Sequence, residues 1–197
     1  MLEILFATNN EGKIKEISEM LSLANIKILT MADFPQIPKI NEDGKTFKEN
    51  ALKKACQISK YTGKICLADD SGLEINHLKG EPGIYSSRWG KTDKERIDKV
   101  LALLENVPED ERNARFVCVL ALVFPDGKKY VVQEECKGKI SSDPRGKYGF
   151  GYDPIFLIPK YNKTFAELGE KIKNNISHRG KALKKMLKII NGLVISE

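Results

Sequence analysis

Apolar and polar residues follow two different periods along the chain. Four stretches repeat apolar residues every three to four positions, as one-sided helices do. The first extends from about residue 13 to residue 23, and the others begin near residues 47, 92 and 178. Five apolar runs predict strands; they cover residues 2–7, 26–30, 65–68, 114–124 and 130–139. Because the predicted helices interleave with the predicted strands, the pattern favours an α/β fold with a mixed β-sheet.

Cap and turn residues mark the ends of several of these elements. Thr46 precedes Glu49 by three positions, which is a capping-box pattern at the start of a helix. Pro125-Asp126-Gly127 separates the last two strands and predicts a hairpin. The apolar positions of the four helices predict their buried faces: Ile14, Ile17, Met20, Leu21, Phe47, Ala51, Ala55, Ile58, Ile97, Val100, Leu101, Leu104, Ala182, Leu183, Met186, Leu187 and Ile190.

The composition narrows the class of protein. The 197 residues suffice for one domain, or for one domain with two lobes, and 41% of them are hydrophobic and can fill a core. No apolar run approaches the ~20 residues that cross a bilayer. The apolar stretch at the start has no basic residues before it, so we expect a first strand rather than a signal peptide, and a cytoplasmic protein.

Cysteine spacing and net charge add little that is specific. The four cysteines, Cys56, Cys66, Cys118 and Cys136, lack the spacing of zinc ligands, and we expect them to be small buried hydrophobes. The net charge of +6 favours anionic partners. It does not distinguish a nucleotide from a nucleic acid or from an ordinary lysine-rich surface.

The segment Thr8-Asn9-Asn10-Glu11-Gly12-Lys13 joins the first predicted strand to the first predicted helix. Such a junction offers free backbone N–H groups and the positive end of a helix dipole, and both suit an anion. Lys13 adds a charge. The alternative is an ordinary polar loop with a helix cap, and the segment lacks the glycine spacing of a Walker A loop.

Two adjacent carboxylates, Asp69 and Asp70, follow a run of buried residues at the end of the third predicted strand. Carboxylates are costly to bury without partners. Because successive strand side chains point to opposite faces, we expect different roles if the strand geometry persists: one acid faces a metal or water, and the other holds the loop. The alternative is a turn that ends the strand.

Glycines flank an aromatic residue in Lys147-Tyr148-Gly149-Phe150-Gly151-Tyr152-Asp153-Pro154. Glycine lets a flat ligand approach the ring and the backbone closely, and stacking of a base on an aromatic ring contributes ~1–3 kcal/mol. The alternative is a glycine-rich turn whose aromatic side chains belong to the core.

The last helix is predicted to begin with two basic residues. Ser177 has the character of an N-cap, which places His178 and Arg179 in the first turn. Cations there oppose the helix dipole. A ligand that carries an anionic or carbonyl group would explain them, and the alternative is a solvated basic helix end.

Together these segments resemble the inosine/xanthosine triphosphate pyrophosphatase family, whose members clear deaminated purine nucleotides. The matching stretches occur in the expected order over nearly the whole chain. They are Thr8-Asn9-Asn10-Glu11-Gly12-Lys13, Thr46-Phe47-Lys48-Glu49-Asn50-Ala51, Ala68-Asp69-Asp70-Ser71-Gly72-Leu73, Pro82-Gly83-Ile84-Tyr85-Ser86-Ser87-Arg88, residues 149–156, and Ser177-His178-Arg179-Gly180-Lys181-Ala182-Leu183.

The resemblance implies a fold and an activity. The fold would be an elongated mixed β-sheet flanked by helices, in a single domain over residues 1–197 with two lobes and a central substrate cleft. The enzyme would be a magnesium-dependent hydrolase that converts ITP, dITP and XTP to the nucleoside monophosphate and pyrophosphate. The resemblance also implies a homodimer, with neither nucleic acid nor membrane as a partner.

The resemblance further implies a role for each matching residue. The triphosphate would be held by Thr8, Asn9, Asn10, Glu11, Gly12 and Lys13. Asp70 would be the general base and a metal ligand, and Glu42 the second metal carboxylate, with Asp43 or Glu49 as alternatives for that ligand. Substrate contacts would come from Ser71, Phe150, Gly151, Tyr152, Asp153, Lys173, His178 and Arg179.

The implied reaction is physically reasonable. Hydrolysis within a triphosphate needs charge neutralisation and an aimed water more than covalent chemistry, and Mg²⁺ suits a site with one or two carboxylates and substrate phosphates. Asp70 would take the proton from the attacking water. If Arg179 or His178 donates to a 6-oxo group, the 6-amino group of adenine leaves that donor unpaired, a rejection that can reach ~10⁴-fold.

Three other functions remain open on the sequence. A pyrophosphatase for another nucleotide class, such as a modified pyrimidine, would share most of these residues. A basic nucleic-acid-binding module predicts clustered lysines and aromatic residues on strands, and it does not need the Asp69-Asp70 pair. A purely structural role leaves the glycine-flanked Phe150 unexplained.

Overall fold

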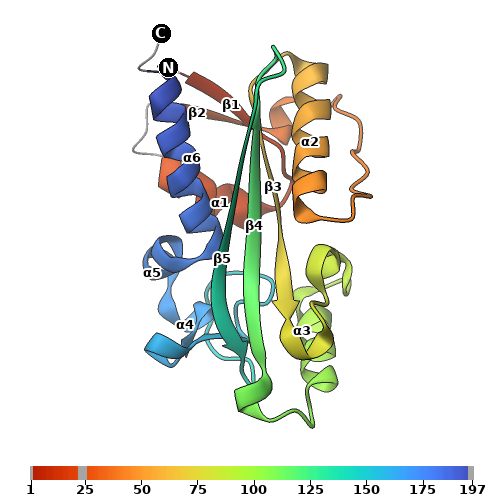
Figure 1. Ribbon diagram of the computed structural model, residues 1–197, viewed down its shortest axis with the longest axis vertical. Helices are drawn as coiled ribbons and strands as arrows, with labels where there is room; N and C mark the ends of the chain where they lie inside the picture. The colour runs from red at the N-terminus through yellow and green to blue at the C-terminus, as the bar shows by residue number, and fades with distance from the viewer. Residues whose placement is uncertain (1, 22–25, 195–197) are drawn as a thin grey trace. The chain divides into compact units, whose positions relative to one another are not determined.

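The computed structural model describes residues 2–21 and 26–194. Helices and strands interleave along the chain (Figure 1). The helices are α1 (Glu11–Leu21), α2 (Phe47–Thr62), α3 (Asp93–Leu103), α4 (Phe165–Leu168), α5 (Glu170–Ile176) and α6 (His178–Val194). The strands are β1 (Leu2–Phe6), β2 (Ile26–Thr30), β3 (Cys66–Ile75), β4 (Asn113–Val123), β5 (Lys129–Ile140), β6 (Phe156–Ile158) and β7 (Lys163–Thr164).

Within the described residues, the strands form one seven-stranded sheet in the order β2-β1-β3-β4-β5-β6-β7. β1 pairs in parallel with both β2 and β3, whereas β6 pairs antiparallel with β5 and with β7. The sheet is therefore mixed, as predicted. The hairpin between β4 and β5 is also confirmed, because these neighbouring strands are joined by a tight turn in which Gly127 N–H donates to Phe124 O at 2.9 Å.

One predicted boundary is wrong in a way that matters for function. The third strand does not end at Ala68 but continues to Ile75. Asp69 and Asp70 therefore lie inside β3 rather than in a turn that follows it. The first helix begins at Glu11, two residues earlier than expected, and the part of that prediction over residues 22–23 lies outside the described residues.

The chain divides into two compact units. Unit 1 comprises Met1–Asp70, Cys118–Glu134 and Arg179–Glu197, and unit 2 comprises Ser71–Val117 and Glu135–His178. The chain passes from unit 1 to unit 2 between Asp70 and Ser71, and it returns for the last time between His178 and Arg179. A single domain with a substrate cleft between two lobes stays a prediction.

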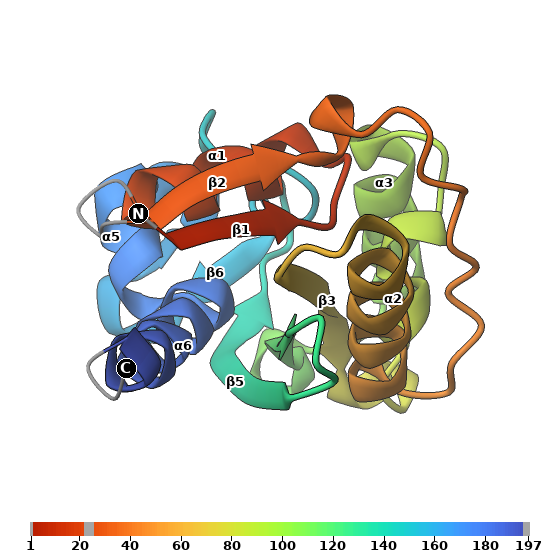
Figure 2. The ribbon, with the colours of Figure 1, turned by 90° about the horizontal axis from the view of Figure 1, so that it is seen from above.

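Unit 1 is built around its own apolar cluster. β1, β3, β4 and β5 contribute to this cluster, and α1 and α6 cover it with the faces that were predicted to be buried, including Ile17, Ala182, Met186 and Ile190. α2 lies on the other side of the strands from α6 (Figures 1 and 2). Its predicted stripe is buried as well, because Phe47 is 7% exposed and the remaining apolar members of the stripe are at most 1% exposed.

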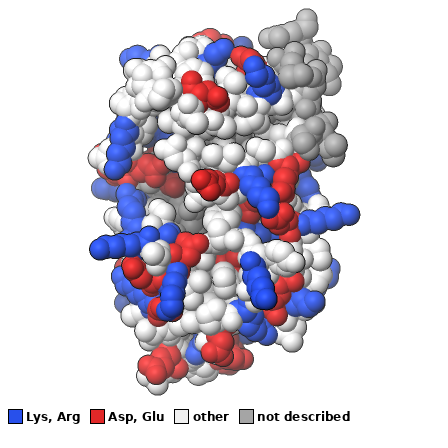
Figure 3. Space-filling model, turned by 180° about the vertical axis from the view of Figure 1, so that it is seen from behind, with Lys and Arg blue, Asp and Glu red and all other residues white. Residues whose placement is uncertain are grey.

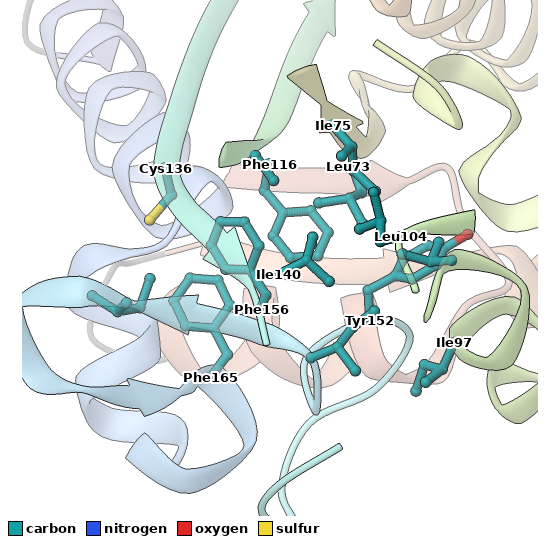
Figure 4. Close-up of a cluster of buried hydrophobic side chains, with 14 of the residues drawn as sticks. Leu73, Ile75, Ile97, Leu104, Phe116, Cys136, Ile140, Tyr152, Phe156 and Phe165 are labelled. Atoms are coloured by element: carbon teal, nitrogen blue, oxygen red, sulfur yellow. The ribbon is translucent and has the colours of Figure 1, made fainter. Parts of the chain in front are cut away.

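Unit 2 has a second apolar cluster, rich in aromatic rings. Phe116, Phe156 and Phe165 contact one another, with ring centroids 4.6–6.0 Å apart (Figure 4). Ile97 and Val100 of α3 pack into this cluster, and Leu101 contacts it while remaining partly exposed. The aromatic rings lie beneath the glycine-rich segment that contains Phe150, because Tyr152 and Ile155 belong to the same cluster.

The prediction for the cysteines holds for three of the four. Cys66, Cys118 and Cys136 are buried, Cys56 is partly buried, and all four are free thiols. In the described part of the chain, no helix combines the length and the apolar character needed to cross a membrane.

Candidate functional site

The β1–α1 junction in unit 1 is an ordered helix start. Asn10 caps α1, because its Oδ1 accepts the N–H of Lys13 at 3.0 Å, and Thr8 Oγ1 in turn accepts the N–H of Asn10 at 3.2 Å. The first turn of an α-helix leaves backbone N–H groups without helical partners. Asn9, Asn10 and Glu11 are exposed at this turn, so an anion can reach it. The geometry fits the phosphate contact that the sequence suggested.

Asp69 lies at the centre of a buried ionic group that we call the Asp69 cluster: Lys13, Glu16, Asp69, Cys118 and Arg179. Lys13 Nζ donates to Asp69 Oδ1. Arg179 Nε and Cys118 Sγ donate to Asp69 Oδ2 at 3.1 and 3.2 Å, and Arg179 Nη1 donates to Glu16 Oε2 at 2.5 Å. Burial alone would raise the pKa of Asp69, but Lys13 and Arg179 outweigh it and hold that pKa well below its usual range.

Asp70 has a different environment, although it is the next residue in β3. It is 7% exposed, and its Oδ2 has no hydrogen-bond partner among the described residues. Burial, with a smaller contribution from Glu42, raises the pKa of Asp70 to about 6, although Lys13 and Lys54 act to lower it. A carboxylate with an available oxygen, between cations, suits a proton acceptor or a cation ligand.

The three alternative metal carboxylates lie in or just before α2: Glu42 and Asp43 are in the preceding loop, and Glu49 is in the first turn of the helix. Glu42 pairs with Lys54 and acts electrostatically on Asp70. Asp43 pairs with the more exposed Lys53 at 2.5 Å. Glu49 serves the helix cap, because its Oε2 accepts the N–H of Lys45 at 2.7 Å. Of the three, Glu42 is therefore the one that the structure links to Asp70.

Asp70 and Glu42 fit a hard cation that takes most of its ligands from phosphates and water. Among the described residues, no group of three or more His, Cys, Asp or Glu side chains is arranged to hold a metal ion. Mg²⁺ usually takes one or two carboxylates, with phosphates and water as its other ligands. Asp70, with its unpartnered oxygen, and Glu42 supply that number of carboxylates.

In unit 2, Asp153 organises the glycine-flanked aromatic residue. Its Oδ2 accepts the N–H of Phe150 at 2.9 Å and the ammonium group of Lys173, and we call these three residues the Asp153 cluster. Lys173 Nζ lies 4.7 Å from the centroid of the Phe150 ring, a cation–π distance. Gly149 has a φ of +80°, and a Cβ there would overlap the Asp153 carboxylate.

Neighbouring residues hold the rest of this segment. Gly151 N–H donates to Asp93 Oδ2 at 2.7 Å, which fastens the segment to the start of α3. Tyr152 is buried, and its hydroxyl donates to Ser86 O at 2.9 Å. Tyr152 therefore supports the segment from within the core, whereas Phe150 is only partly buried.

The two basic residues at the start of α6 belong to different units. His178, in unit 2, is 3% exposed and stacks on Phe116, with ring centroids 4.7 Å apart and planes 10° apart. Arg179, in unit 1, is in the Asp69 cluster. The helix begins at His178, as predicted, but the carboxylates of Asp69 and Glu16 already explain the cation in its first turn. A ligand is not needed to account for Arg179.

The structure thus brings the predicted residues together in two groups. Lys13, Asp69, Asp70, Glu42 and Arg179 are linked in unit 1 through contacts or electrostatic coupling. Phe150, Asp153 and Lys173 are linked in unit 2. Ser71 follows Asp70 in β3 and is partly buried.

Several residues near these groups were not predicted from the sequence to have a role in the site. Glu16, Asn50 and Lys54 carry only weak sequence signals. Glu16 is three positions after Lys13 in α1, and Lys54 is four positions after Asn50 in α2, so each pair shares a helix face. Cys118 carries no such signal, because only the pairing of β3 with β4 brings it to Asp69.

Comparison with known proteins identifies the family of the chain. The model of the Ham1 family matches residues 4–189. A dITP/XTP pyrophosphatase from Desulforamulus reducens is 47% identical over 100% of this chain and 99% of its own length, and one from Geobacter sulfurreducens is 46% identical over 93% and 94%. A HAM1 protein structure from Coxiella burnetii covers 98% of this chain and 100% of its own, with a TM-score of 0.88 and 45% identity. The chain therefore belongs to the Ham1 family.

Proposed function

We propose that this protein hydrolyses deaminated purine nucleoside triphosphates, namely ITP, dITP and XTP, to the nucleoside monophosphate and pyrophosphate. The relatives named dITP/XTP pyrophosphatase support this substrate class, because they match over nearly their full length. The observation that carries the proposal is Asp70: a buried carboxylate with one unpartnered oxygen, close enough to Lys13 and Lys54 for both to lower its pKa.

In this proposal the residues of unit 1 act on the phosphates. The start of α1 binds the triphosphate with residues Thr8–Lys13, through backbone N–H groups and the positive end of the helix dipole. Lys13 adds a positive charge that offsets part of the triphosphate charge. Asp70 accepts the proton of the attacking water, for which its pKa of about 6 is suitable, since it is ionised at neutral pH and still basic.

The residues of unit 2 would bind the nucleoside. Phe150 stacks on the base, and the backbone of Gly151 lets the sugar and base approach closely. Asp153 and Lys173 hold Phe150 in place through the contacts described above. His178 of unit 2, or Arg179 of unit 1, supplies the hydrogen-bond donor for the 6-oxo group, and Ser71 contacts the substrate next to the general base.

We further propose that Mg²⁺ is the cofactor, with Asp70 and Glu42 as its protein ligands. When bound, the ion would neutralise charge on the phosphates and on the leaving pyrophosphate. A homodimer in the cytoplasm completes the proposal. Sedimentation velocity of the purified chain tests the oligomeric state, and a monomer at micromolar concentration would contradict it.

The alternative of a nucleic-acid-binding module has less support. On the face seen in Figure 3, the described Lys and Arg side chains are interspersed with Asp and Glu. A nucleic-acid-binding face usually gathers basic residues in a patch or stripe. The buried Asp69-Asp70 pair also has no use in such a module.

A triphosphate panel tests the proposed function. ITP, dITP, XTP, ATP, GTP and a modified pyrimidine triphosphate are each incubated with the enzyme and Mg²⁺, and pyrophosphate and orthophosphate are measured separately. We expect equal amounts of monophosphate and pyrophosphate from the first three substrates. Orthophosphate with a diphosphate as the first products would overturn the proposal, and preparations of Asp70→Asn control for contaminating phosphatases.

A further inference from the structure

Asn50 is a fully buried polar residue in the first turn of α2. Its Oδ1 accepts the N–H of Gly44 at 2.8 Å. A backbone N–H can only donate, so the oxygen of the Asn50 side chain must face Gly44, and the orientation of the amide is settled by that contact. The NH₂ group of Asn50 must therefore point to the other side.

The contact with Gly44 fastens the loop that carries Glu42 to α2. A Cβ at Gly44 would lie 2.7 Å from Asn50 Oδ1 and 2.8 Å from Glu49 Cβ, so only glycine permits this approach. The next residue, Lys45, donates its N–H to Glu49. The loop is thus held at two successive backbone N–H groups, two and three residues after Glu42.

The other end of the Asn50 amide meets Asp70. Asn50 Nδ2 and Asp70 Oδ2 are both buried, and neither has a hydrogen-bond partner within standard limits in the described part of the chain. The Asn50 side chain nevertheless lies near enough to Asp70 to lower the pKa of that carboxyl, as a donor close to a carboxylate does. Buried polar atoms are rarely left without partners. A donor and an acceptor that are both unsatisfied and adjacent complete each other after a small movement.

We propose that Asn50 is a positioning residue that ties the Glu42 loop to the Asp70 carboxylate. One end of its amide holds the loop through Gly44, and the other end orients Asp70. The consequence for turnover rests on the function proposed above, whereas the contact with Gly44 and the burial of both unpartnered atoms do not. This gives a role to the Thr46–Ala51 segment of the sequence beyond capping a helix.

Two substitutions separate the two ends of the amide. Asn50→Asp keeps an oxygen for Gly44 N–H but removes the NH₂ donor, and Asn50→Leu removes both. We expect hydrogen exchange at the Gly44 amide to stay within about twofold of wild type in Asn50→Asp and to accelerate about tenfold in Asn50→Leu, the loss of one buried hydrogen bond. Unchanged exchange in a folded Asn50→Leu protein would refute the loop contact.

The Asp70 contact is tested without and with substrate. The side-chain NH₂ signals of Asn50 should differ in chemical shift between the NMR spectra of the wild type and of Asp70→Leu. Identical signals would refute the contact. In steady-state kinetics with ITP, both Asn50 variants should lose about 10–100-fold in kcat, as supporting residues of metal and catalytic groups do, with KM nearly unchanged. Normal kcat in Asn50→Leu would overturn the proposal. A lower kcat in Asn50→Asp alone would then come from the negative charge that this substitution adds.

Ser59→Ala is the matched control. Ser59 is also buried in α2, and its hydroxyl donates to Lys64 O at 2.8 Å, away from Asp70. It should lower stability without changing kcat or exchange at Gly44. An inactive wild-type enzyme would refute the proposed function, yet the exchange and NMR measurements would still test Asn50.

Discussion

The Asp69 cluster of unit 1 and the Asp153 cluster of unit 2 each contain a buried carboxylate that contacts a buried cation, but they are assembled differently. Asp69 lies 56 residues from Lys13 and 110 from Arg179, and Arg179 lies 163 from Glu16. Asp153 lies three residues from Phe150 and 20 from Lys173. The first cluster depends on residues of unit 1 from four elements, namely α1, β3, β4 and α6, whereas the second depends on one loop and one short helix.

This difference suggests a division of labour. Charges that must stay fixed against a triphosphate are held by several elements at once, so a change in any one element disturbs them all. The aromatic contact for a base needs only local support. We therefore expect substitutions in unit 1 to affect turnover and stability together, and substitutions in unit 2 to affect mainly substrate affinity and selectivity.

The largest expected effect is that of Asp70→Asn on turnover. The variant should fold, because the side chains are nearly the same size, and kcat for ITP should fall by ~10²–10⁴, the usual effect of losing a general base. Circular dichroism checks the fold, and pyrophosphate release gives the rate. Turnover near the wild-type value in a folded protein would remove Asp70 from the mechanism.

The second test compares two arginines that each contact two carboxylates. Arg179 is 3% exposed and contacts Asp69 and Glu16, whereas the exposed Arg115 contacts Glu74 and Glu135. Breaking the buried pairs with Arg179→Ala should cost ~3–5 kcal/mol of unfolding free energy. Arg115→Ala should cost at most ~1 kcal/mol. Urea titrations measure both, and equal losses would mean that burial does not set the importance of Arg179.

The same Arg179→Ala variant tests base recognition, under conditions in which enough of the variant is folded for kinetic measurements. A donor to the 6-oxo group predicts that kcat/KM falls strongly for ITP and XTP and little for ATP, so selectivity collapses. A uniform fall for the three substrates would assign Arg179 to the phosphates or to the support of Asp69. His178 and backbone groups would then recognise the base.

The third prediction concerns stability and pH without metal. The pKa of Asp70 is about 6 in the folded protein and about 3.8 in the unfolded chain, so the folded state binds the proton more tightly. The tighter binding of this proton therefore contributes fully to the free energy of unfolding below pH 4. That contribution, at most ~3 kcal/mol, is lost as the pH rises through 6. Asp70→Asn should thus be more stable than wild type at pH 7.5 in EDTA, with the difference shrinking toward pH 4. Thermal unfolding checks this, and an equal difference at both pH values would contradict it.

The smallest expected effect is that of Phe150→Ala in unit 2. Loss of base stacking, ~1–3 kcal/mol, should raise KM for ITP by about 5- to 150-fold and leave the unfolding free energy nearly unchanged. Inhibition by pyrophosphate, which has no base, is the control and should not change. Weaker inhibition by pyrophosphate would mean that Phe150 also supports the phosphate contacts, and the division between the units would fail.

Much of this architecture could be predicted from local patterns. The faces of α1, α2 and α6 follow from apolar spacing, and the Thr46 cap is present, with Thr46 Oγ1 accepting the N–H of Glu49 at 3.1 Å. The short elements were missed, because the four residues of α4 and the seven of α5 are too few for a periodic signal. Gly169 lies between α4 and α5, and a glycine interrupts a helical pattern.

The site was harder to predict, for a reason that is physical. The predicted third strand ended with its apolar run at Ala68, and whether the strand geometry continued through Asp69 and Asp70 was left open. The cations that offset the cost of burying Asp69 come from α1 and α6. The same distant contacts explain the basic start of α6. Pairings across more than 50 residues leave no local periodic signal in a single sequence, so Asp69 and Arg179 each stand out in the sequence, but their contact does not.

The position of Arg179 also matters for how the chain is made. Arg179 follows Glu16 by 163 residues, so at 5–20 residues per second the ribosome adds it about 8–30 s after Glu16. During that interval the nascent unit 1 cannot form the contacts of Arg179 with Glu16 and Asp69. A chain released before α6 is made would contain Glu16 and Asp69, which are buried in the complete protein, without their arginine partner. We expect such fragments to be substrates for cellular proteases rather than partly active enzymes.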